Sequence, residues 1–302
     1  MAKIAIDLER ALRDRALNGT PGGIAPRMIA RGDGWTVADV ICTSGPQDRP
    51  FEEQHSHVSL AIVAAGSFQY RSPLGRALMT PGSMMLGNAG HCFECGHEHG
   101  AGDRCVSFWF SVDYFERLAA DAGLRGGRAR FTIARLPPVR AMSPLVARAC
   151  AGVVTPTNAP WEELAVELAV RALQVVSGIP PGPVSSPRGA EARVTDAVRR
   201  IETQPDSAQT LGSLARDASL SPFHFLRTFE RLTGVTPHQY VLRARLREAA
   251  IRLSVESSSV LDVALDCGFG DVSNFNRAFR AEFGVTPRAF RAARLLPRSE
   301  HA

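Results

Sequence analysis

The segment HCFECGHEHG, residues 91–100, holds two cysteines and three histidines in ten positions. Thiolate and imidazole groups bind zinc and other borderline-soft cations, and they also serve metal-dependent catalysis and thiol redox chemistry. A DNA-binding zinc finger needs about twelve residues between its cysteine pair and its histidine pair. Only Gly96 separates Cys95 from His97, so no helix fits between them, and the spacing excludes a finger.

A second pair of histidines, His55 and His57, lies upstream in a strand-like stretch. Residues two apart on a strand share a face, so this pair converges with the later cluster if the strands pack together. Mixed sulfur and nitrogen ligands favour zinc or another transition metal over magnesium or calcium. The sequence therefore predicts a ligand-sensing metal site at His55, His57, Cys95, His97 and His99.

Three other interpretations of these residues stay open. Cupin-type metalloenzymes also use an H-x-H pair with a later histidine, but a glutamate usually follows their pair by about four residues, whereas VSLAI follows His57 here. A redox sensor at Cys92, Cys95 or Cys105 requires an exposed thiol with a low pKa. In a purely structural role the polar side chains bond to the backbone, and Cys42 and Cys105 are buried as small apolar residues.

Composition narrows the function classes. The chain has 302 residues, 45% of them apolar and 22% charged, which suits a protein with two ordinary domains. We expect no membrane segment, because no apolar run approaches about 20 residues, and we expect no secretory signal. A cytoplasmic location follows, in which the cysteines are free thiols or metal ligands. Net charge +5 weakly suggests a polyanionic partner. Lys3 is the only lysine, which excludes enzymes that need a Walker-type or Schiff-base lysine.

The elements that position these residues divide the chain into segments. Short apolar runs cut by turns predict an N-terminal arm and a small β-barrel sensor over residues 1–134. Helical periodicity predicts a helix pair within 135–178, which forms a dimer seam or simply covers the barrel. Residues 179–190 are rich in Pro, Gly and Ser and indicate a linker, and 191–294 is predicted to be an all-α DNA-binding domain.

The C-terminal segment contains an internal duplication. Arg227, Phe229 and the Gly-Val-Thr-Pro of 234–237 recur fifty residues later as Arg277, Phe279 and 284–287. Each copy is predicted to be a helix, a tight turn and a second helix, with Ser221 before Pro222 and Asp271 as the caps of the second helices. A duplication this well aligned marks one supersecondary unit used twice, a double helix-turn-helix.

The second helix of each copy has a core face and an exposed face. Phe225 and Phe229, like Phe275 and Phe279, lie four apart and must face the core. Arginine and asparagine on the opposite face suit bidentate readout of guanine and adenine in the major groove. The predicted DNA-binding residues are Phe223, His224, Leu226, Arg227, Val272, Ser273, Asn276 and Arg277.

One helix over residues 237–254 is predicted to join the two units. It would hold the reading helices about one DNA turn, ~34 Å, apart on one face of the duplex. Its arginines at 243, 245, 247 and 252 are expected to contact phosphates in part.

The stretch GFGDVSNFNRAFRAEFGVTPRAFR (268–291) closely resembles the signature of the AraC/XylS family of bacterial transcription regulators, and the resemblance spans about residues 192–293. It implies that seven of the eight predicted positions, all but His224, face bases. Leu226 and Val272 depart from the polar residues usual there and could read a thymine methyl group. The N-terminal half resembles, more loosely, the cupin-type sensor often joined to this unit.

The resulting expectation is an α+β multidomain protein: an N-terminal all-β cupin-like barrel with flanking helices, and a C-terminal all-α domain with two helix-turn-helix units. Its expected function is sequence-specific transcription regulation on double-stranded DNA, modulated by a small-molecule or metal effector in the barrel. The resemblance further implies a homodimer and, for an activator, contact with RNA polymerase. The rivals are a cupin-type metalloenzyme with an accessory helical domain and an architectural DNA binder without a sensor.

Overall fold

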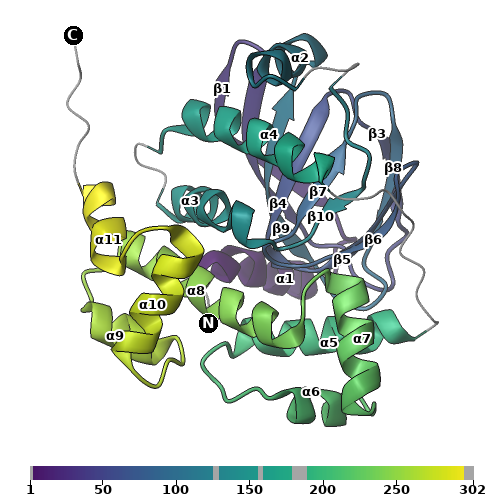
Figure 1. The fold of residues 1–302 in the computed structure, drawn as a ribbon. Coiled ribbons are helices and arrows are strands. Elements are labelled where there is room, and N and C mark those ends of the chain that lie inside the picture. The colour runs from purple at the N-terminus through teal and green to yellow at the C-terminus, as the bar shows by residue number, and fades with distance from the viewer. Residues whose placement is uncertain (1–2, 125–128, 156–158, 179–188, 296–302) are drawn as a thin grey trace.

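The structure, a computed structural model, describes residues 3–124, 129–155, 159–178 and 189–295. The strands and their covering helices lie in the upper part of Figure 1, and helices α5–α11 lie below and to the left of them. An all-β N-terminal half and a helical C-terminal half are as the sequence predicts. Most of the predicted linker, residues 179–188, falls outside the described residues.

Two antiparallel sheets face each other in the N-terminal half. The six-stranded sheet has the order β1 (Ile24–Gly32), β2 (Trp35–Cys42), β9 (Asp103–Phe110), β4 (Val58–Gly66), β7 (Met84–Gly87), β10 (Arg135–Leu136). The four-stranded sheet has the order β3 (Phe51–Gln54), β8 (Cys92–Gly96), β5 (Phe68–Ser72), β6 (Gly75–Met79).

Alternation along the central strand β4 separates two apolar layers. Leu60 and Ile62 join the cluster that includes the covering helices, whereas Ala61 and Val63 join the cluster between the sheets. This is the period of two that a strand buried on both faces shows. The space between the sheets is therefore lined by every second residue of the strands.

Helices cover the outer face of the larger sheet. These are α2 (Val112–Asp121), α3 (Ser143–Val154) and α4 (Trp161–Ser177), with the short helix η2 (Arg140–Met142) before α3. Leu145, Leu164 and Leu168 are buried against the sheet within this one chain, so α3 and α4 do cover the barrel. The N-terminal arm forms η1 (Lys3–Ala5) and α1 (Ile6–Asn18), and α1 is a helix beyond those predicted from the sequence.

The C-terminal half contains the predicted duplication. One unit is α6 (Leu211–Asp217) and α7 (Pro222–Thr233), and the other is α9 (Val260–Asp266) and α10 (Val272–Phe283). The long helix α8 (Pro237–Val255) joins them, with α5 (Ala190–Thr203) before and α11 (Pro287–Leu295) after. The predicted core phenylalanines are fully buried, as expected: Phe225, Phe229, Phe275 and Phe279.

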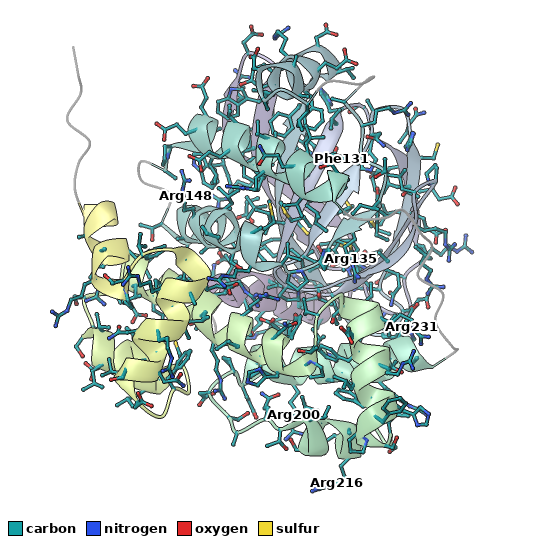
Figure 2. The ribbon with its side chains drawn as sticks, viewed as in Figure 1. Phe131, Arg135, Arg148, Arg200, Arg216 and Arg231 are labelled. Atoms are coloured by element: carbon teal, nitrogen blue, oxygen red, sulfur yellow. The ribbon has the colours of Figure 1, made fainter. Side chains whose placement is uncertain are left out.

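The two halves are docked against each other. Leu78 of β6 belongs to the apolar core of the first unit, and Ala147 of α3 belongs to that of the second. Arg135 of β10 donates to the carbonyl of Leu78 and to the carbonyl of Leu232 in α7, and Figure 2 shows it between the barrel and the helices below. In the described part of the chain, no helix is long and apolar enough to span a bilayer.

Candidate nucleic-acid interface and sensor cavity

The two reading helices begin and end in the same way. The Ser221 hydroxyl caps α7 by accepting from the backbone N–H of His224, and the Asp271 carboxylate caps α10 by accepting from that of Asn274 at 2.7 Å. Both helices end at a glycine with positive φ, Gly234 and Gly284. The predicted caps are thus confirmed, and they fix which side chains each helix exposes.

The outer face of α7 combines an aromatic and a cationic side chain. Phe223 is 62% exposed, a large apolar area for a side chain on a surface helix. The Arg227 guanidinium lies 5.7 Å from the centre of the Phe223 ring, a cation–π distance. His224 is exposed as well, whereas Leu226 is half-buried. The four predicted residues of this helix therefore lie on or beside one accessible face.

The outer face of α10 is more polar. Ser273, Asn276 and Arg277 are exposed, and Val272 is half-buried. Arg277 donates to the side-chain oxygen of Asn274 at 3.1 Å, which limits the directions that the guanidinium takes. Asn274 is not among the predicted residues, although its place one turn before Arg277 signals the contact.

Two further arginines extend these faces by one turn. Arg231 of α7 and Arg280 of α10 are both exposed, and the same helical spacing would have identified them. Figure 2 shows Arg231 and Arg216 at the outer surface of the first unit. They add positive charge beside the predicted reading residues, as a polyanionic partner requires.

The four arginines of α8, expected to contact phosphates in part, are each engaged by other groups of the chain. Arg247 pairs with Glu202 of α5 at 2.6 Å, and Arg243 pairs with Glu282 of α10 at 3.2 Å. Arg252 pairs with Glu256 and Asp266, at 3.0 and 2.8 Å.

The remaining arginine, Arg245, donates to the backbone carbonyls of Pro205, Ser207 and Gly268, so it joins the α5–α6 loop to the turn of the second unit. These partners come from distant segments, which the helix sequence alone does not reveal.

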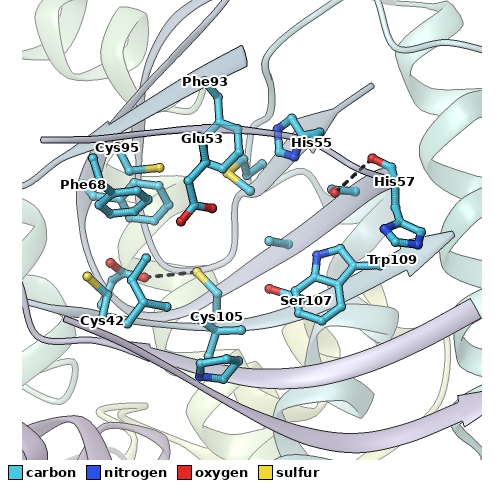
Figure 3. Close-up of a pocket in the computed structure, with 18 of the residues that line it drawn as sticks. Cys42, Glu53, His55, His57, Phe68, Phe93, Cys95, Cys105, Ser107 and Trp109 are labelled. Carbon is cyan, nitrogen blue, oxygen red and sulfur yellow. Dashed lines mark hydrogen bonds between the residues drawn. The ribbon is translucent and has the colours of Figure 1, made fainter. Parts of the chain in front are cut away.

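A cavity of about 600 Å³ lies between the two sheets. Figure 3 shows Cys42 and Cys95 at one end of the cavity, Cys105 closer to its middle, and His55, His57 and Trp109 at the other end. Apolar side chains such as Phe68 and Phe93 form much of the wall, and Glu53 from β3 reaches into the middle. A size of 300–1,000 Å³ with few polar groups is typical of small-molecule sites.

The structure distributes the five residues of the predicted metal site among separate environments. His55 is buried, hydrogen-bonds to the Tyr70 hydroxyl at 2.9 Å and stacks on Phe93. Its burial lowers its pKa to about 4, so the ring is neutral at pH 7. His57 is exposed and contacts the Ser56 hydroxyl at 2.8 Å.

The later three residues of that set also diverge. Cys95 lies at the opposite end of the cavity from the His55–His57 pair (Figure 3). His97 is buried against Asp103, with its Nε2 2.7 Å from a carboxylate oxygen, and His99 is half-exposed beside Glu98. Among the described residues the five do not meet as one ligand group; His97 lies instead with Cys42 and Asp103.

Comparisons with known proteins agree with the C-terminal geometry. A family described as a helix-turn-helix domain matches residues 214–293, which contain both units. The probable transcription factor PqrA of Proteus vulgaris is 34% identical over 110 residues, which make up 36% of this chain and 90% of PqrA. The chain belongs to the AraC family of transcription regulators.

Other relatives of this AraC-family regulator match different shares of the chain. The HTH-type transcriptional activator RhaS of Salmonella agona is 30% identical over 194 residues, 62% of this chain and 68% of RhaS. A crystal structure of an AraC-type transcriptional regulator from Chromobacterium violaceum is 30% identical with a TM-score of 0.34 and covers 37% of this chain and 99% of that one. The helix-turn-helix match and the RhaS relationship show that the chain is a DNA-binding transcription regulator, and PqrA and RhaS both carry regulator names.

Proposed function

We propose that this regulator reads a specific duplex sequence with the exposed faces of α7 and α10 and that an effector in the barrel cavity changes this reading. The observation that carries the proposal is the pair of equivalent capped helices, each with an exposed arginine at the same position, held by one helix α8. A matched pair of reading helices suits two contacts on one side of a duplex.

Each reading helix is assigned a chemistry. Arg277 and Asn276 of α10 offer bidentate donors and acceptors for guanine and adenine, and Arg227 of α7 offers the same for guanine. Phe223, Leu226 and Val272 suit apolar contact with thymine methyl groups, while His224 and Ser273 suit either bases or phosphates. The second unit therefore supplies most of the hydrogen-bonded readout.

The effector acts by shifting a population. A ligand that fits one arrangement of the barrel better than another favours that arrangement, and the docked first unit moves with it. The direct contacts from β6 and β10 to the first unit support this path. A homodimer, contact with RNA polymerase for an activator, and a cytoplasmic location are proposed from family membership alone.

Duplex binding with matched variants tests the proposal. Wild-type chain is titrated on a selected site and on a scrambled duplex across a salt series. We expect site preference for the wild type, loss of that preference in Arg277→Ala, and no change in Arg13→Ala, which removes an exposed arginine from α1. Binding that is equal for both duplexes in the wild type contradicts the proposal.

A further inference from the structure

A buried group of three potential ligands lies at the cysteine end of the barrel. Cys42, the last residue of β2, is the register partner of Asp103, the first residue of β9. His97 follows the end of β8, and its Nε2 lies 2.7 Å from Oδ1 of Asp103. The Cys42 sulfur, one ring nitrogen of His97 and one carboxylate oxygen of Asp103 all lie within 4.8 Å of one another. The three residues are 4%, 4% and 6% exposed.

The protein's own hydrogen bonds do not use this group fully. Nδ1 of His97 is buried and has no hydrogen-bond partner among the described residues. A buried polar atom without a partner costs about 1–3 kcal/mol. Such an atom, in a side chain that is 99% buried next to a thiol and a carboxylate, suggests a ligand that the protein itself does not supply.

The donor types select the class of ligand. Sulfur, imidazole nitrogen and carboxylate oxygen together match zinc and similar borderline-soft cations, whereas calcium and magnesium take oxygen ligands. Cys105 donates its thiol to Oδ2 of Asp103 at 3.3 Å and faces the cavity, so a fourth ligand is at hand.

A redox role fits these cysteines less well than a metal. Burial, with the Asp103 charge second, raises the pKa of the Cys42, Cys95 and Cys105 thiols, whereas a redox-active thiol is an exposed one with a lowered pKa. Binding of a cation would displace the Cys42 thiol proton to solvent and leave a thiolate on the metal.

Two of the three ligands flank one loop: His97 begins it and Asp103 directly follows it. The middle of this loop contacts the DNA-binding half. This loop, residues 97–102, joins β8 to β9. The backbone carbonyl of His99 accepts from Arg199 of α5 at 2.6 Å. Arg76 pairs with Glu98 of the loop at 3.4 Å and with Glu191 of α5 at 2.8 Å.

Glu98, His99 and Glu191 themselves form a second, more exposed group of ligand types. The Arg76 guanidinium already lies against both carboxylates of that group, so a cation there would meet a positive charge. Among the described residues, no arginine or lysine pairs with Asp103 of the buried group, so the buried group is the better metal site.

We propose that Cys42, His97 and Asp103 bind one zinc-type divalent cation and that its occupancy changes how the 97–102 loop docks on α5, and so the affinity for DNA. This inference rests on the proposed function for its regulatory part. A cation that fixes His97 and Asp103 fixes both ends of the loop. Two linked sites of this kind typically change each other's affinity about 5- to 150-fold.

The test uses the full chain after chelator treatment, with Zn²⁺ as the probe. We expect one equivalent of Zn²⁺ to bind the wild type, and binding to fall at least tenfold in Cys42→Ser and His97→Gln. Cys92→Ser and His99→Ala are the matched controls, since both side chains lie outside the group, and they should bind as the wild type does. Thiolate-to-metal absorption with Co²⁺ should be kept in Cys92→Ser and reduced in Cys42→Ser, which assigns a ligand sulfur to Cys42 in protein whose fold is intact.

Duplex affinity with and without Zn²⁺ completes the test. A change of at least about fivefold in the wild type and in His99→Ala, absent in His97→Gln, supports the proposal. Lack of stoichiometric Zn²⁺ binding, or equal binding by the Cys42 and His97 variants, overturns the metal site. Zn²⁺ binding without any change in duplex affinity overturns its regulatory role. Site-selective DNA binding in the metal-free chain is measured separately, so these failures leave the proposed function standing.

Discussion

Gly234 ends α7 and Gly284 ends α10 with nearly the same torsion, φ 82° and 78°, but the two turns have different neighbours. A Cβ at Gly234 would lie 2.4 Å from Pro137, which follows β10 of the barrel. A Cβ at Gly284 would meet nothing within 4 Å. The same sequence motif is therefore packed against the barrel in the first unit and left open in the second.

The other contacts repeat this difference. The first unit touches β6 and β10 of the barrel itself, whereas the second packs on α3, a helix that covers the outer face of the larger sheet. The first unit also has the more apolar reading face, with Phe223, and the second the more polar one, with Asn276 and Arg277. The two copies thus share one local structure but differ in their surroundings: under the proposed function both read the duplex, and only the first is also in direct contact with strands of the barrel.

The largest expected effects come from the aromatic cores. Phe229→Ala and Phe279→Ala should each lower the free energy of unfolding of their unit by about 3–5 kcal/mol. Phe279 contacts the rings of Phe275 and Phe283 in its own helix and that of Phe290 in α11. Hydrogen exchange should therefore show lost protection in α9–α11 for Phe279→Ala and across the barrel contact for Phe229→Ala. Identical exchange patterns in the two variants would remove the proposed difference.

The glycine pair tests the docking directly. Gly284→Ala should cost about 1–2 kcal/mol, the strain of a left-handed residue with a side chain. Gly234→Ala carries the same strain plus an overlap with Pro137, a further cost of about 1–3 kcal/mol. Urea midpoints measure both. Equal losses would mean that the first unit is not held against the barrel as described.

The reading faces should differ in selectivity. Arg277→Ala should reduce discrimination between the best duplex and a single-mismatch duplex by about 1–3 kcal/mol, because it removes a bidentate contact. Arg227→Ala should reduce it less, since the Arg227 guanidinium already lies against the Phe223 ring. Competition titrations give both ratios. A larger loss for Arg227→Ala would reverse the roles assigned to the two units.

The smallest expected effects come from the helix caps. Ser221→Ala and Asp271→Ala each remove one cap hydrogen bond and should cost about 1 kcal/mol. Thermal unfolding compares the two variants with Ser221→Asp and Asp271→Ser, which retain a capping oxygen. Full stability in the alanine variants would show that packing alone determines where these helices start.

The duplicated units were predictable because their signals are local. Caps and phenylalanines four apart act within one helix and its turn, and the observed elements confirm them. The partners of the α8 arginines were not predictable, since Glu202 and Glu282 come from other helices. The contacts at the cysteine end of the barrel were not predictable either. Cys42 meets Asp103 only through the register of β2 on β9, and no local pattern states which strands pair.

Selection of bound sequences from a random duplex library, followed by footprinting of the full chain, tests the central claim most directly. The account predicts an enriched site with two protected blocks about one helical turn apart on one face of the duplex. Arg227→Ala should weaken one block and Arg277→Ala the other. Recovery of unenriched sequences, or of a single block that neither variant changes, would contradict it.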